Sequence, residues 1–173
     1  MVIISARPYF VYSYPGYARR SLMPFTVENF AEKTNESRMT HLTNLAIQKK
    51  HSDFKSLKNK VTMSVNELVD YLIQSGIIKT AQEYYEKVDE KINEVMRLMF
   101  LQMKEKLDRK FGCFEVFGFD FMLDSNLNPY LLEVNINPAL FLDTPVLEEM
   151  LPKLISDTCR FAAEIHKPYE KSA

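Results

Sequence analysis

The sequence has only four glycines, Gly16, Gly76, Gly112 and Gly118, and they are far apart. The two common glycine-rich loops that cradle phosphates need several glycines within a few positions. Neither loop is therefore present in these 173 residues. If the protein handles nucleotides, other residues must hold the phosphates.

Cysteine, net charge and long apolar runs are also scarce. Cys113 and Cys159 have no second Cys or His at ligand spacing, which favours reduced thiols over a zinc site or a disulfide. The 22 basic and 23 acidic residues leave a net charge of -1, so no overall basic field favours nucleic acid or an anionic membrane. No stretch approaches the roughly 20 apolar residues of a membrane span, and the first residues lack a signal-peptide pattern. These features predict a cytoplasmic protein.

The apolar residues that are present, 46% of the chain, suffice for one packed core. Their spacing predicts helices and strands in a definite order. The prediction comprises a strand pair within 2–14, a long loop over 24–40, a helix from a Ser64–Glu67 capping box to Gly76, a helix over about 80–111, strands over 113–124 and 129–140, and a terminal helix interrupted near Pro152.

Polar side chains occupy alternate positions of the second predicted strand, "YLLEVNINPAL". Successive side chains of a strand point to opposite faces, so Glu133, Asn135 and Asn137 share one face. A turn centred between Asn126 and Leu127 would place Asp120 directly opposite Glu133.

Two like charges facing each other across strands are destabilising, and a bound cation would remove the conflict. Magnesium prefers oxygen ligands, which Asp120, Glu133 and the amide oxygen of Asn135 can supply. The alternative is a solvated outer face, because any half-exposed antiparallel strand has polar residues at every second position. The pattern by itself leaves both interpretations open.

The stretch "FEVFGFDFMLDSNLNPYLLEVNINPAL" strongly resembles the metal-binding hairpin of the tubulin tyrosine ligase-like family, which belongs to the ATP-grasp ligases. "PYFVYSYPGYARRS" and "HLTNLAIQKK" resemble two further family segments, in the same order. The resemblance extends from about Arg7 to His166. It implies an α+β fold, the C-terminal portion of an ATP-grasp domain, with a largely antiparallel sheet covered by helices.

The resemblance also implies the cofactors ATP and Mg²⁺ and a set of site residues. Asp120, Glu133 and Asn135 would bind the magnesium ions that bridge the ATP phosphates. The implied contacts of the nucleotide are His41, Thr43 and Asn44, with Met122 and Leu132 bordering the adenine, and Arg19 would bind the carboxylate that is activated.

The implied activity is that of an ATP-dependent carboxylate-amine ligase. A carboxylate would receive the γ-phosphoryl group, and the acyl phosphate would be attacked by the amine of a free amino acid. The carboxylate would belong to a tail of tubulin or of another protein with acidic tails, and the location would be the cytoskeleton, including a cilium or axoneme. "NINPAL" resembles the glycine-adding members, so glycine is favoured over glutamate or tyrosine. Neither nucleic acid nor a membrane is an expected partner.

Several segments of the family's site have no counterpart in the sequence, including its phosphate-binding lysine and flexible phosphate-covering loop. We therefore expect residues 1–173 to be the C-terminal part of the catalytic domain, with its N-terminal part missing, and a weak catalyst in isolation. One alternative is a catalytically incomplete fragment that binds microtubules or another protein through the basic stretches "QKKHSDFKSLKNK" and "YARRS". Another is an ATP-grasp ligase that acts on small peptides.

Overall fold

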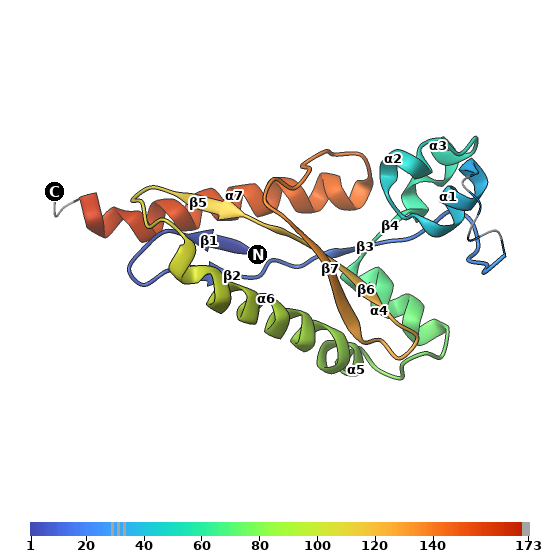
Figure 1. Ribbon diagram of the computed structural model, residues 1–173, viewed down its shortest axis with the longest axis horizontal. Coiled ribbons are helices and arrows are strands. Elements are labelled where there is room, and N and C mark those ends of the chain that lie inside the picture. Colours follow the sequence, from blue (N-terminus) through green and yellow to red (C-terminus); the bar gives the residue numbers. More distant parts are fainter. Residues whose placement is uncertain (29, 31, 33, 171–173) are drawn as a thin grey trace. The chain divides into compact units, whose positions relative to one another are not determined.

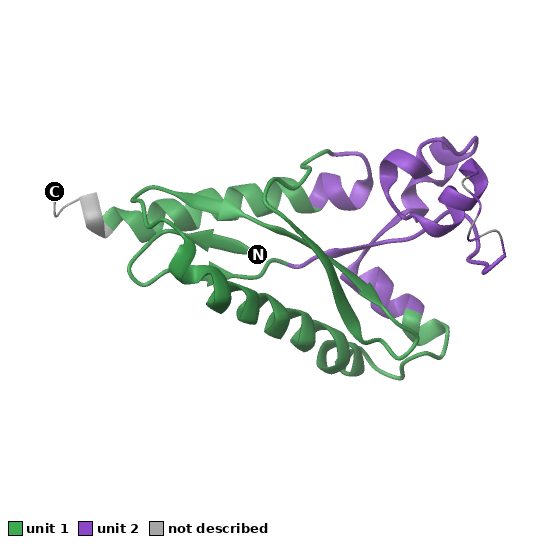
Figure 2. Cartoon of the chain, in the orientation of Figure 1, with its two compact units in different colours: residues 1–14, 72–141, 150–173 green, residues 15–71, 142–149 purple. Residues whose placement is uncertain are grey.

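A computed structural model of the chain describes residues 1–28, 30, 32 and 34–170 (Figure 1). The chain forms two compact units (Figure 2), each built from separate stretches of sequence. The first unit contains residues 1–14, 72–141 and 150–173, and the second contains residues 15–71 and 142–149. Helices alternate with antiparallel strand pairs, so the expected α+β class is confirmed.

The first unit contains a three-stranded sheet, a hairpin and most of the helical residues. Its elements are β1 (Val2–Ile4), β2 (Phe10–Tyr12), α5 (Ala81–Tyr84), the π-helical segment η2 (Tyr85–Asp89), α6 (Glu90–Met103), the 3-10 segment η3 (Lys104–Lys106), β5 (Phe114–Val116), β6 (Gly118–Leu123), β7 (Pro129–Asn135) and α7 (Pro145–Glu170) from residue 150 onward.

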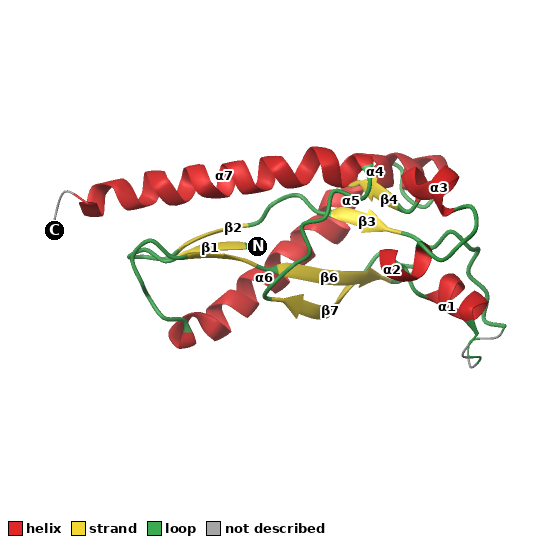
Figure 3. Ribbon diagram, turned by 90° about the horizontal axis from the view of Figure 1, so that it is seen from above, coloured by secondary structure: helices red, strands yellow, loops and turns green. Residues whose placement is uncertain are grey.

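The three-stranded sheet has the order β2-β1-β5, with both pairs antiparallel. All three residues of β1 are buried, which is typical of a central strand covered on both faces. Tyr9, next to β2, packs edge to face on Phe100 of α6, and Tyr12 of β2 packs on Phe161 of α7. The sheet therefore lies between these two helices (Figure 3).

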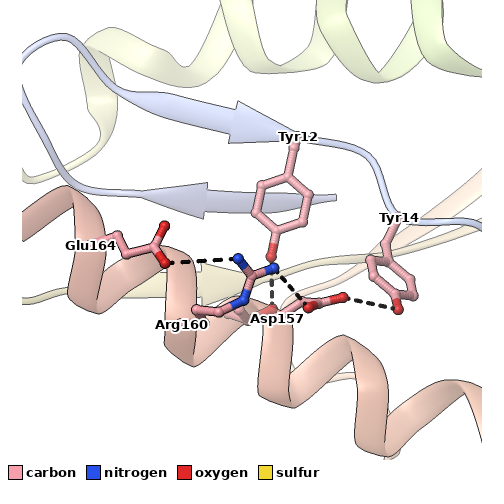
Figure 4. Close-up of polar contacts among 6 residues, drawn as sticks. Tyr12, Tyr14, Asp157, Arg160 and Glu164 are labelled. Carbon is pink, nitrogen blue, oxygen red and sulfur yellow. Dashed lines mark hydrogen bonds and ion pairs between the residues drawn. The ribbon is translucent and has the colours of Figure 1, made fainter.

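Polar side chains fasten β2 and the residues after it to α7 (Figure 4). The Tyr12 hydroxyl lies 2.9 Å from Thr158 Oγ1, and the Tyr14 hydroxyl donates to Asp157 at 3.5 Å. Arg160 joins the same cluster through Asp157, at 3.0 Å. Thr158 is fully buried, so its hydrogen bond also satisfies a group that would otherwise be costly to bury.

Several predicted elements of this unit need correction. The strand expected over 129–140 ends at Asn135, so Asn137 lies beyond it. The helix expected over 80–111 begins after its cap at Thr80 but ends at Lys106, because Leu107 turns to an extended conformation and its carbonyl accepts a hydrogen bond from the Tyr9 hydroxyl at 2.9 Å. The single strand expected over 113–124 is two strands, since the chain leaves the sheet at Phe117 and enters the hairpin at Gly118.

The second unit contains short elements. They are β3 (Tyr17–Arg19), α1 (Asn35–His41), α2 (Leu45–Gln48), α3 (Phe54–Leu57), the 3-10 segment η1 (Lys58–Lys60), β4 (Thr62–Ser64), α4 (Val65–Gln74) up to residue 71, and the first turn of α7. β3 and β4 pair antiparallel, with Arg19 opposite Thr62.

The loop expected over 24–40 is wrong for its last part, where α1 begins. Thr34 caps this helix, since its hydroxyl accepts from Ser37 N at 3.1 Å, and Ser37 and Thr40 are buried. A buried polar face gives no apolar periodicity, so the pattern of the sequence did not reveal the helix.

The boundaries of α4 agree with the prediction. Ser64 N donates to Glu67 at 2.7 Å and Glu67 N donates to Ser64 Oγ at 3.2 Å, which is a capping box. Gly76 follows the helix with a φ of +70°, the left-handed conformation that favours glycine at a helix end.

The predicted interruption of the terminal helix near Pro152 is wrong, because α7 runs without a break from Pro145 to Glu170. Pro152 is exposed, whereas Leu151, Leu154 and Thr158 are buried. Burial of this face outweighs the one backbone hydrogen bond that the proline removes. No helix of the part of the chain that the structure describes is long and apolar enough to cross a membrane.

Candidate functional site

The β6–β7 hairpin brings the two predicted carboxylates together. Asp120 is the register partner of Glu133, as the sequence predicted, and Gly118 and Phe119 pair with Asn135 and Val134. Directly opposed side chains lie about 5 Å apart at Cβ, so the two carboxylates share one face of the hairpin.

The turn of this hairpin differs from the predicted one. Leu123 pairs with Pro129, so the turn is centred on Asn126. The expected centre, between Asn126 and Leu127, lies half a residue further along the chain. Leu127 adopts a left-handed conformation with a φ of 63° and is buried. A β-bulge between the two halves of the hairpin then shifts the register by one residue. Leu132 is the extra residue of the bulge, and the shift restores Asp120 to its place opposite Glu133.

Asp124 holds the turn. Its carboxylate accepts hydrogen bonds from Asn126 N at 2.9 Å, from Asn128 N at 2.8 Å and from Asn128 Nδ2 at 3.0 Å. These bonds, the one from the Asn128 side chain first, lower the pKa of Asp124. Lys91 of α6 donates to Asn128 Oδ1 at 2.9 Å and thereby ties the turn to the helix.

The donor set around the carboxylate pair fits a hard divalent cation. Asn135 Nδ2 donates to Glu133 Oε1 at 3.1 Å, which leaves the amide oxygen of Asn135 as an acceptor beside the two carboxylates. Three oxygen donors with several open positions suit magnesium, which keeps waters and substrate phosphates in its shell. No group of three or more His, Cys, Asp or Glu suitable for a metal occurs among the described residues, so the asparagine is needed to complete a set of three.

Apolar side chains border the carboxylates on the open hairpin. Met122, Tyr130 and Leu132 are 57%, 57% and 59% exposed. Large apolar side chains at this level of exposure, next to acidic groups, are typical of a surface that receives a ligand. Met122 and Leu132 were predicted to border the adenine, whereas Tyr130 was not singled out.

The other predicted residues belong to the second unit. His41 is the last residue of α1, and its ring packs edge to face with Phe25 and Phe30, at centroid distances of 5.5 and 5.1 Å. Both ring nitrogens are buried without a hydrogen-bond partner among the described residues. An unsatisfied buried imidazole is costly and is therefore a good candidate for a ligand contact.

Asn44 and Thr43 follow α1, and Asn44 has a structural task. Its Oδ1 accepts from Ala46 N at 2.8 Å and so caps α2. Thr43 is half-buried, and Arg19 lies in β3. The roles of these residues toward a ligand stay predictions.

Gln48, which the sequence did not single out, holds this region together. It is completely buried, and its Nε2 donates to the carbonyls of Met39 and Leu42 at 2.8 and 2.6 Å. Its Oε1 accepts from Leu22 N at 2.9 Å. One glutamine thus fixes the backbone on both sides of His41, but a single amide side chain in a polar stretch gives no distinctive sequence signal.

The family model described as "Tubulin-tyrosine ligase family" matches residues 1–172. The chain belongs to the tubulin-tyrosine ligase family. Its fold is accordingly of the ATP-grasp type, as the resemblance implied. That residues 1–173 form the C-terminal part of a larger domain stays a prediction.

Several curated members of the tubulin-tyrosine ligase family are similar to the chain. "Protein polyglycylase TTLL10" of Rattus norvegicus is 31% identical over 167 residues, which are 95% of this chain and 24% of the rat protein. "Inactive polyglycylase TTLL10" of Homo sapiens is 30% identical, with 95% of this chain and 24% of that protein covered. "Probable tubulin polyglutamylase TTLL2" of Mus musculus is 31% identical, with 90% and 28% covered. The chain spans about a quarter of the length of these relatives.

Proposed function

We propose that the chain carries the magnesium- and nucleotide-binding hairpin of a ligase that uses ATP to join an amino acid to carboxylates of tubulin tails. The observation that carries the proposal is the pairing of Asp120 with Glu133 on an open hairpin face, with Asn135 beside them. Like charges directly opposite each other across strands are unfavourable, and a pure binding module has no need for them.

The residues of the hairpin have distinct tasks in this proposal. Asp120, Glu133 and the Asn135 oxygen hold the metal, and Met122 and Leu132 offer apolar contacts to the adenine. The metal, when bound, supplies the charge stabilisation that phosphoryl transfer mainly needs. In the second unit, we assign Arg19 to the carboxylate that becomes activated, and His41, Thr43 and Asn44 to the nucleotide.

We propose glycine as the amino acid that is added. The segment "NINPAL" and the polyglycylase names of two relatives support glycine, whereas a relative named as a polyglutamylase supports glutamate. Tubulin, or another protein with acidic tails, would be the acceptor, which places the activity on the cytoskeleton, including cilia.

A second function has an observation of its own in its favour. Four lysines are exposed in the turn after α2, on α3 and on η1, and none of them forms an ion pair with the described residues: Lys50, Lys55, Lys58 and Lys60. Such a surface attracts acidic tails. A chain that binds microtubules without catalysis would use these lysines alone, and one relative is named as inactive.

Mass spectrometry of microtubule tails tests both functions. The chain is incubated with microtubules, Mg-ATP and differently labelled glycine, glutamate and tyrosine. Three variants run in parallel: Glu133→Ala, the matched control Glu115→Ala on β5, and the charge reversal of the four lysines to glutamate.

Incorporation of one label that Glu133→Ala abolishes and Glu115→Ala retains would establish the ligase and name its amino acid. Absence of every label, together with cosedimentation that the lysine reversal abolishes, would establish the binding function and show that residues 1–173 do not catalyse the ligation by themselves. Absence of both labels and lysine-dependent cosedimentation would overturn the binding function as well.

A further inference from the structure

Tyr130 occupies a place on the hairpin that the bulge creates. It is the register partner of Met122, and Met122 lies two residues beyond Asp120 on the same strand. Directly paired residues share a face, and so do residues two apart on a strand. Tyr130 therefore lies on the face that carries Asp120 and Glu133.

A regular hairpin would give a different wall beside the same carboxylates. With Asp120 opposite Glu133 and no bulge, Phe121 would face Leu132 and Met122 would face Leu131. The observed bulge instead moves Leu131 opposite Phe121 and brings Tyr130 opposite Met122. The bulge thus leaves the carboxylate pair unchanged and replaces a leucine by an aromatic ring on the open face.

The Tyr130 ring is available for a planar partner. The residue is 57% exposed, as is its register partner Met122. The Tyr130 hydroxyl points to Asp124 Oδ2, at 3.4 Å, which steadies the ring from the side of the turn.

We propose that Tyr130 is a further contact of the nucleotide base, added to Met122 and Leu132 by the bulge, and that Asp124 is the positioning residue that selects this register. The inference rests on the proposed nucleotide-binding function of the hairpin. The Asp124 carboxylate accepts hydrogen bonds from the backbone N–H groups of Asn126 and Asn128. We therefore assign it to stabilising the turn and not to binding the metal. Stacking on an aromatic ring is a general way to hold a base.

Calorimetric titration of the chain with ATP and, separately, with inorganic tripolyphosphate, both with Mg²⁺, tests the assignment. Tyr130→Ala is expected to weaken ATP binding about tenfold and to leave tripolyphosphate binding unchanged, because only ATP has a base. Tyr130→Phe keeps the ring and should keep the affinity. Tyr71→Ala, at an exposed tyrosine of α4, is the matched control.

Asp124→Ala should weaken ATP binding in the same selective way, because the turn no longer holds the bulged register. Asp124→Asn retains an acceptor for the two backbone N–H groups and should rescue most of the loss. Unchanged tripolyphosphate binding in each variant also demonstrates that the hairpin is folded.

The outcomes separate this inference from the function on which it rests. Equal ATP affinity of Tyr130→Ala and the unaltered chain would overturn the role of Tyr130. Equal losses for ATP and tripolyphosphate would overturn it as well, since they would reflect a damaged hairpin rather than a lost base contact. Failure of the unaltered chain to bind either ligand would overturn the nucleotide site itself, and the inference with it.

Discussion

Replacement of Gln48 by methionine should loosen the region around His41. Methionine has nearly the length of glutamine but no amide, so packing is kept while three hydrogen bonds to Leu22 N, Met39 O and Leu42 O are lost. Each part-buried backbone group left without a partner costs about 1 kcal/mol, which gives about 3 kcal/mol in total for Gln48→Met.

Hydrogen exchange measured residue by residue is the direct assay for this variant. The Leu22 amide donates to Oε1 of the fully buried Gln48, so it is expected to exchange slowly in the unaltered chain. A loss of about 3 kcal/mol corresponds to about a hundredfold faster exchange. Lys50→Met, at an exposed neighbouring position, is the control and should leave the rate unchanged.

The reasoning would be refuted by slow exchange of the Leu22 amide in Gln48→Met, with an unfolding midpoint equal to that of the unaltered chain. Such a result would mean that the three backbone groups find other partners. It would also remove the argument that this glutamine fixes the residues on both sides of His41.

Three further outcomes are expected. Pro152→Ala should raise the free energy of unfolding by about 2 kcal/mol in urea denaturation, because the proline is exposed inside α7 and removes one helical hydrogen bond; a lower stability would contradict this account. Ser64→Ala should lower it by about 1 kcal/mol through loss of the capping box, with Asn66→Ala as the control within the same helix. The pKa of Asp124 is lowered in the folded chain, so its contribution to stability is present above the unfolded pKa of about 4 and is lost as the pH falls through the folded pKa. NMR titration of its carboxyl carbon should give a midpoint below that of a free aspartate, and an ordinary midpoint would contradict the hydrogen bonds of the turn.

The hairpin illustrates how far the sequence predicts a site. The turn residues and the alternation of polar residues predicted that Asp120 faces Glu133, and the register agrees. The sequence did not predict how this pairing arises. The turn lies half a residue from its expected position and the bulge at Leu132 shifts the strand register, and the two changes offset each other at Asp120 and Glu133. The shift at Leu132 lets Leu131 and Val134, three residues apart, both face the phenylalanines of β6, which a regular strand cannot achieve.

Elements stabilised by polar contacts were harder to predict than those with apolar periodicity. The helix α1 buries Ser37 and Thr40, and Gln48 acts through distant backbone groups, so neither gives a periodic signal. At Pro152 the rule that proline interrupts a helix failed, because here apolar burial decides: the buried leucines of α7 keep the helix continuous. Local propensity is a weak guide where tertiary burial decides.

The division of each unit into separate stretches of sequence has a consequence for how the protein can be dissected. The chain changes unit after Tyr14, Tyr71, Phe141 and Glu149, and two of these changes fall inside the helices α4 and α7. No single cut can release either unit as one continuous piece. Both ends of the chain belong to the first unit, so a truncation from either end removes part of that unit before it reaches the second. Point substitutions, not shortened chains, are therefore the means to assign a function to each unit.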